Sequence, residues 1–183
     1  MNNSNSITDF REIDYRVHSL YSIIDGLEIA IIGLKSKIHK IEWYDGAWLK
    51  EEAEPIYGLA FIAFQNYVNG TIFDLTGSSV DKHKYYRLNP CFEHYSRSKI
   101  ELIVGLANYF KHRDDDGPFS PGTFKILDSF ELNTSKDAVI IDSSPVFEGL
   151  TILNDNWDLS EIISIVKDWR ANLLNVTILK DRS

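Results

Sequence analysis

One segment of the chain is apolar on almost every side, and it constrains the fold more than any other feature. The segment runs from Ile56 to about Phe73, and its polar interior residues are few: Gln65, Asn66 and Asn69. A helix without a polar face belongs at the centre of a protein. The longest apolar stretch ends at Phe64, far short of the roughly 20 residues that cross a membrane, so we expect the central helix of a soluble fold.

Helical periodicity continues on both sides of this segment. Apolar residues recur at steps of three and four over residues 10–38, which predicts one long helix. Proline is tolerated in the first turn of a helix but not in its interior, so the central helix is expected to begin near Pro55. A third helix is predicted over about 92–113. Asp158 and Glu161 have the spacing of a capping box that starts a last helix.

The remaining segments are expected to be less regular. Residues 76–90 are predicted to form a loop, and residues 123–130 fit a short helix. The runs 138–141 and 176–179 are rich in β-branched residues and are able to pair as a ribbon. The fold prediction is therefore mainly α. It is a single domain over residues 1–183, a bundle of four main helices with an irregular insertion at about 114–157 and, as an option, a small β-ribbon.

Composition excludes several classes of protein. The single Cys91 cannot form an intramolecular disulfide, which excludes a disulfide-framed secreted fold. The polar start, residues 1–6, lacks the charged and apolar regions of a signal peptide. With Lys+Arg 19 against Asp+Glu 27, the net charge is −8. We therefore expect an acidic, cytoplasmic protein that has no contact with a membrane.

Charge is distributed unevenly along the chain. In residues 82–113 seven basic residues stand against two acidic ones, and tyrosines and phenylalanines are interleaved with them. Bases mixed with aromatic residues are typical of RNA binding, in which phosphates are neutralised and bases stack. The alternative is a basic surface that pairs with the acidic remainder of the same protein.

Polar residues of the third predicted helix share one face. Arg97, Glu101, Gly105, Asn108 and His112 fall within a narrow arc at helical spacing. His112 could transfer a proton and Asn108, one turn before it, could orient a phosphate, while Lys111 and Arg113 could neutralise phosphate charge. The alternative is a cationic helix end that opposes the macrodipole.

Two side-chain amides of the central helix are candidate hydrogen-bond partners for this polar face. Gln65 and Asn69 could hydrogen-bond this polar stripe, or they could form a network that only fixes the register between helices.

The sequence Ala107-Asn108-Tyr109-Phe110-Lys111-His112 resembles the motif of HEPN-type domains, which consists of an Arg, a polar residue, a few spacers and a His. The resemblance implies a helical bundle that commonly dimerises, and a metal-independent ribonuclease of toxin–antitoxin or phage-defence systems. It places Asn108 on the polar position and His112 on the catalytic His. Ala107 occupies the Arg position and cannot stabilise phosphate charge, so the resemblance is to a degenerate member.

A metal site is the next candidate. His83, Cys91 and His94 could supply three zinc ligands, with the last two one turn apart. A structural zinc site usually has four ligands in tighter pairs, and the chain has no second cysteine. We therefore expect neither a metal nor another cofactor.

Two functions remain. The acidic charge, small size and incomplete catalytic set favour a binding protein of the immunity or antitoxin type, which neutralises a basic nuclease toxin by direct contact. The alternative is the HEPN-like ribonuclease, with His112 and Asn108 as catalytic residues, RNA held by residues 82–113 and a homodimer as an option. Further residues expected to contact a partner lie on the second and third predicted helices: Gln65, Asn69, Arg97, Glu101, Lys111 and Arg113.

Overall fold

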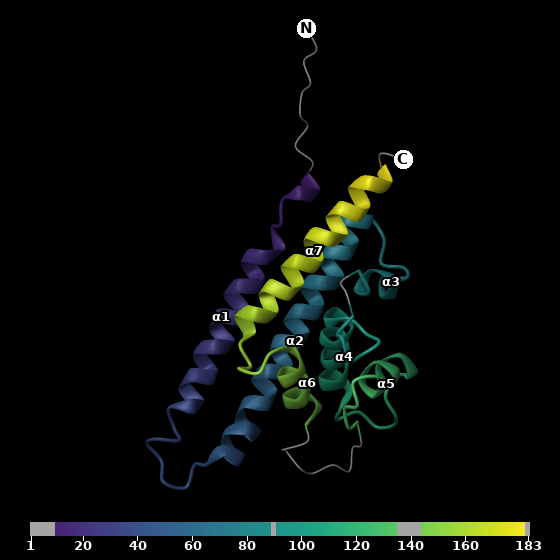
Figure 1. Cartoon of the computed structure of the whole chain (residues 1–183). Coiled ribbons are helices and arrows are strands. Elements are labelled where there is room, and N and C mark those ends of the chain that lie inside the picture. Colours follow the sequence, from purple (N-terminus) through teal and green to yellow (C-terminus); the bar gives the residue numbers. More distant parts are fainter. Residues whose placement is uncertain (1–9, 89–90, 135–143, 182–183) are drawn as a thin grey trace.

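The long helix α2 (Gly46–Thr76) runs through the centre of a helical bundle, as its apolar sequence predicts. The computed structural model describes residues 10–88, 91–134 and 144–181. Helix α1 (Arg16–Lys35) and helix α4 (Lys99–His112) flank α2 on opposite sides, and α7 (Leu159–Asp181) crosses in front of α1 and α2 (Figure 1). These four helices are the main helices of a mainly α fold, which confirms the predicted class.

The central helix begins earlier than the sequence predicts. Asp45 caps its first turn, because the Asp45 carboxylate accepts hydrogen bonds from the backbone N–H groups of Ala47 and Trp48. Pro55 consequently lies inside the helix rather than in its first turn. At its other end the helix stops at Gly77, whose φ of 68° is in the left-handed region that glycine tolerates best.

Two other long helices are shorter than predicted. A 3-10 turn (Phe10–Glu12) precedes α1, and α1 ends at Lys35 instead of continuing to residue 38. Helix α4 starts at Lys99 instead of about residue 92, because Ser98 and Glu101 form a complete capping box.

The connecting segments contain three short helices: the one at Pro121–Asp128 confirms the short helix predicted over residues 123–130, and the other two correct the prediction. Helix α3 (Lys82–Tyr86) interrupts the predicted loop. The predicted irregular insertion contains α5 (Pro121–Asp128) and α6 (Pro145–Leu153), each with proline in the first turn and a capping serine. The β-like run 176–179 is part of α7, so the ribbon prediction is wrong for that half, and its other half, 138–141, lies outside the described residues.

The core is built from the inner faces of these helices. Trp169 of α7 is fully buried, and its indole Nε1 donates a 2.8 Å hydrogen bond to the Tyr85 carbonyl. The other large side chains that are completely buried come mostly from α2 and α4: Tyr57, Phe61, Phe64, Ile72, Ile100, Leu102, Ile103 and Leu106. This core fixes α4 against α2 and thereby places the polar residues predicted to form a site.

Candidate functional site

Gln65 joins the central helix to α4 through both ends of its amide. The buried Gln65 Nε2 donates to Asn108 Oδ1 at 2.8 Å, and Lys111 Nζ donates to Gln65 Oε1 at 2.6 Å. Three of the residues predicted to form a site therefore meet in one polar relay. The relay links two helices, so it fixes their register as well as holding the Lys111 ammonium in place.

Asn69 has a different partner. Its Oδ1 accepts a 2.7 Å hydrogen bond from the hydroxyl of Tyr86, a phenol whose pKa is raised to about 12 by burial. Asn69 therefore ties α2 to α3 rather than to the polar stripe of α4.

A groove lies beside the relay on the surface of α2. Apolar side chains of α1 and α2 form one part of it, and polar residues of α2 and α4 form the other. The groove encloses about 520 Å³, and its lining consists of Ile23, Leu27, Leu59, Ile62, Ala63, Gln65, Asn66, Asn69 and Lys111. We call it the α1–α2 groove. A second hollow of about 270 Å³, which ends at Tyr15 and Tyr67, shares three of these lining residues and so adjoins it.

Lys111 is the charged group of the groove. Burial lowers the pKa of its ammonium. Its hydrogen-bond acceptor is the neutral Gln65, and it forms no ion pair with any carboxylate in the described part of the chain.

The other residues of the predicted catalytic set are not assembled with Asn108. The side chain of His112 is 57% exposed, and its Nδ1 lies 2.8 Å from Asp115. Arg113 points elsewhere: its Nη1 pairs with Glu54 at 2.8 Å, and its guanidinium stacks over the Phe110 ring. Ala107 is completely buried, so the position that carries Arg in the HEPN motif faces the core.

The predicted polar stripe of α4 is only partly a surface feature. Glu101 is buried and pairs with Arg97 at 2.8 Å and with Arg87 at 2.9 Å. Burial alone would raise the pKa of this carboxyl, but the Ser98 N–H and the two guanidinium groups outweigh it and hold the pKa below its usual range. Gly105 is also buried, because it packs against Ile126 of α5. Arg97 and Glu101 therefore serve the start of α4 rather than a binding surface.

The three residues considered as zinc ligands, His83, Cys91 and His94, do not form a metal site. Cys91 is exposed, and in residues 10–88, 91–134 and 144–181 no three side chains of the metal-ligating types come close enough together to hold an ion.

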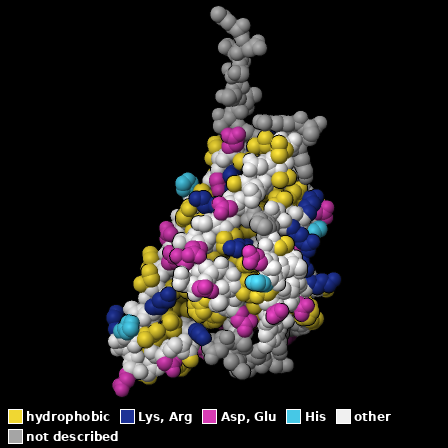
Figure 2. Space-filling model, in the orientation of Figure 1, with side chains coloured by type: hydrophobic (Ala, Val, Ile, Leu, Met, Phe, Trp, Pro, Cys, Tyr) yellow, Lys and Arg dark blue, Asp and Glu magenta, His cyan; other side chains and the backbone are white. Residues whose placement is uncertain are grey.

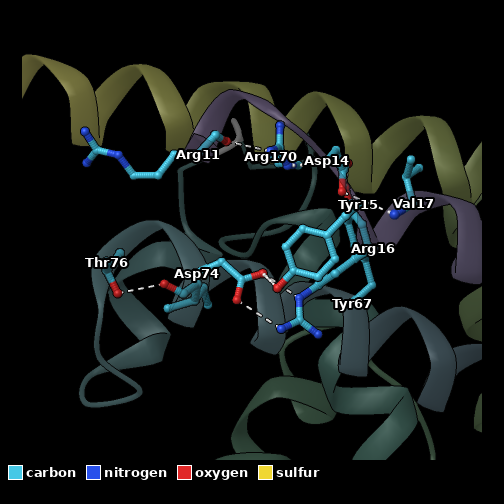
Figure 3. Close-up of polar contacts among 10 residues, drawn as sticks. Arg11, Asp14, Tyr15, Arg16, Val17, Tyr67, Asp74, Thr76 and Arg170 are labelled. Atoms are coloured by element: carbon cyan, nitrogen blue, oxygen red, sulfur yellow. Dashed lines mark hydrogen bonds and ion pairs between the residues drawn. The ribbon is translucent and has the colours of Figure 1, made fainter. Parts of the chain in front are cut away.

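An ionic cluster near the start of α1 was not predicted from the sequence. Figure 3 shows Arg16 and Tyr15 converging on Asp74 of α2, with Arg16 Nε at 2.5 Å and the Tyr15 hydroxyl at 2.9 Å from Asp74 Oδ2. Asp14 accepts a hydrogen bond from the Tyr67 hydroxyl at 2.5 Å and forms an ion pair with Arg170 of α7 at 3.3 Å. The partners are scattered along the chain, so no spacing in the sequence could indicate them.

The residues of this cluster line an open pocket of about 260 Å³. Asp74 is held ionised, because the Arg16 hydrogen bond lowers its pKa. Since Asp14 and Asp74 each have an arginine partner, the cluster fastens the first helix to α2 and α7.

The outer face of α1 exposes apolar side chains to solvent. Ile29 is 70% and Ile32 is 66% exposed, and neither Gly26 nor Gly33 has an atom within 4 Å of the place where a Cβ would lie. We call these four residues the α1 outer face. Figure 2 shows hydrophobic side chains along α1 at the left edge of the molecule, with acidic side chains next to them where α7 begins.

Carboxylates border this face. Burial raises the pKa of Glu28, and the nearby charges of Asp158 and Asp25 raise it further. Asp158 accepts hydrogen bonds from the first turn of α7, and Glu161 belongs to the same turn. None of the four forms an ion pair within the described ranges of the chain. We call Asp25, Glu28, Asp158 and Glu161 the acidic border.

By length and composition α1 is the one helix among the described residues that could cross a membrane. Its inner side packs on the core through Leu20, Ile24 and Ile31.

Comparisons of the chain with protein families, curated proteins and solved structures found no match.

Proposed function

We propose that the protein binds a basic protein partner by direct contact, and that it acts as an immunity or antitoxin-type protein against a nuclease toxin. The observation that carries the proposal is the exposure of Ile29 and Ile32 on α1 beside the carboxylates of the acidic border. Exposed apolar surface with a polar rim is typical of protein interaction sites.

The two parts of this surface have different roles in the proposal. Burying the isoleucines against a partner removes apolar area from water and supplies affinity. The acidic border has no cation partner among the described residues, so its charge is available to a basic surface. Complementary charge speeds encounter and selects against acidic partners.

The ribonuclease alternative has less support from the contacts of its residues. It needs Asn108, His112 and a cation around one phosphate. Asn108 is engaged by Gln65, His112 by Asp115 and Arg113 by Glu54. Its Arg position is Ala107, which lies in the core.

Two surface variants and one control test the proposal. The full chain is immobilised as wild type, as the double variant Ile29→Glu/Ile32→Glu and as the double variant Asp25→Lys/Glu161→Lys. Val80→Glu is the control, because Val80 is 69% exposed and lies outside α1. Proteins of the source cell are then passed over each, and the affinity of any retained protein is measured against salt concentration.

We expect one basic protein to bind the wild type and the Val80→Glu control equally, and to bind both double variants at least tenfold more weakly. Its affinity should fall as salt rises. A partner that binds Ile29→Glu/Ile32→Glu as tightly as it binds the wild type would contradict the proposed surface.

A further inference from the structure

The α1–α2 groove contains a cation that the fold does not neutralise. Four arginines that are less exposed than Lys111 are paired with carboxylates: Arg16 with Asp74, Arg97 with Glu101, Arg113 with Glu54 and Arg170 with Asp14. Lys111 is partly desolvated, yet its acceptor is a neutral amide. Lys111 is the one charged residue among those that line the groove, so the charge that complements the groove is that of an anion.

The lysine is held in a defined position. Gln65 accepts one of its hydrogen bonds at 2.6 Å, and Gln65 is itself fixed by donating to Asn108 at 2.8 Å. An ammonium has three donors, so two remain for a ligand. A carboxylate could accept both without displacing Gln65.

The rest of the groove is apolar. Leu59 is half exposed, and together with Ile62 and the α1 residues Ile23 and Leu27 it lines the groove on the side away from the amides. From Leu59 to Asn69 the groove follows ten positions of α2, which is about 15 Å of helix. Its volume of about 520 Å³ is within the range of small-molecule sites, roughly 300–1,000 Å³.

We propose that the α1–α2 groove binds a medium-chain aliphatic carboxylate, with the carboxylate on Lys111 and the chain over Leu59, Ile62 and Ile23. The site is separate from the α1 outer face, which lies on another side of α1, so either assignment can fail without the other. Asn66 and Asn69 line the polar part of the groove and favour an oxygen-containing head group over a bare hydrocarbon.

Calorimetric titration of the full chain tests the assignment. The probes are dodecanoate, decanoate and dodecanol, all below their micelle-forming concentrations. The variants are Lys111→Met, which removes the charge, Lys111→Arg, which keeps it, and Leu59→Glu, which reverses the polarity of the apolar part. Val80→Glu and Ile32→Glu are controls outside the groove. Circular dichroism checks that each variant is folded.

We expect one dodecanoate to bind per chain, at least tenfold more tightly than dodecanol. Lys111→Met should lose that tenfold preference, Lys111→Arg should keep it, and Leu59→Glu should weaken dodecanoate binding at least tenfold. A fully buried chain gains about fourfold in affinity per methylene, so an open groove should give about twofold per methylene between decanoate and dodecanoate. Both controls should bind as the wild type does.

Three results would overturn the assignment. The first is the absence of saturable dodecanoate binding, and the second is equal binding by wild type and Lys111→Met. The third comes from a leucine-rich helical peptide that contains one glutamate. If this peptide binds more tightly than dodecanoate and depends on Lys111, the groove accepts a protein segment and not a small carboxylate. If Lys111→Met is unfolded, Leu59→Glu decides the question, because dodecanoate binding by this variant at wild-type affinity would also overturn the assignment.

Discussion

Arg97 and Glu101 form an ion pair across the start of α4, with 2.8 Å between Arg97 Nη1 and Glu101 Oε1 and with the Glu101 side chain only 3% exposed. The second carboxylate oxygen of Glu101 accepts the Ser98 N–H at 3.0 Å. A residue predicted to contact a partner is instead an internal anion that connects the cap of α4 to the segment before it.

Replacing Glu101 should destabilise the fold. Glu101→Ala leaves Arg97 and the Ser98 N–H without their acceptor, and breaking a fully buried pair costs about 3–5 kcal/mol. Because the second partner, Arg87, is 57% exposed, we expect about 2–3 kcal/mol, which is below the cost for a fully buried pair. Arg87→Ala should cost less than about 1 kcal/mol, as exposed pairs do. Urea unfolding of both variants measures the difference in unfolding free energy, and equal losses in the two variants would contradict the prediction.

The same carboxylate makes stability depend on pH. The folded pKa of Glu101 is lowered, so the stability that it contributes is fully present above the ordinary glutamate pKa of about 4.3. That contribution is lost as the pH falls through the lower, folded pKa. The difference in unfolding free energy between wild type and Glu101→Ala should therefore be constant above about pH 5 and shrink below about pH 4.3. A difference that grows on acidification would have the wrong sign.

Two helix glycines should respond in opposite ways to alanine. A Cβ on Gly58 would overlap the ring of Phe110, so Gly58→Ala should destabilise the protein by about 1–3 kcal/mol through overpacking. Gly33 has open space instead, so Gly33→Ala should stabilise α1 by roughly 0.5–1 kcal/mol. Thermal unfolding of the two variants measures both changes in stability. A stabilised Gly58→Ala would mean that Phe110 moves aside at little cost.

His112→Ala should have little effect. Its side chain is 57% exposed and its partner Asp115 is 62% exposed, so the loss of unfolding free energy should stay below about 1 kcal/mol. In a bacterial host, expression of wild type and His112→Ala should permit equal growth if the protein is a binding protein. Growth arrest by the wild type alone would favour the ribonuclease instead.

The exposed isoleucines should tolerate charge where their buried neighbour does not. Ile29→Glu and Ile32→Glu should unfold at urea concentrations close to that of the wild type, because both side chains face solvent. Ile24→Glu places a charge in the core, where Ile24 is completely buried, and should prevent folding. Circular dichroism separates the cases, and an unfolded Ile29→Glu would show that the outer face is packed.

The main helices could be predicted because their apolar spacing is local information. Their boundaries depended on caps: Asp45 outweighs the preference of Pro55 for a first turn, and Ser98 delays α4. The β-like run 176–179 is helical because Thr177 is buried against the bundle and its hydroxyl bonds back to the Leu173 carbonyl. Packing therefore overrides β-propensity there.

The candidate site could be predicted only in part. Gln65 meets Asn108, as helical spacing suggested, but its second partner is Lys111, which was not part of the predicted stripe. Glu101 could not be recognised as internal, because its neutralising partner Arg87 lies 14 positions away in a segment with no periodic pattern. The apolar stripe predicted over residues 10–38 did not include Ile29 and Ile32, and the structure places both on the exposed outer face of α1.

The ionic cluster at the start of α1 also has a consequence for synthesis of the chain. Arg170 donates to the Arg11 carbonyl, a contact between residues 159 positions apart, and it also pairs with Asp14. During translation these two contacts cannot form until Arg170 has left the ribosome. Until then the start of α1 is held to α2 by their shared apolar side and by the contacts of Arg16 and Tyr15 with Asp74 and of Asp14 with Tyr67. The nascent chain therefore has a long interval in which a chaperone or an early-arriving partner can reach the N-terminal helix before α7 locks it in place.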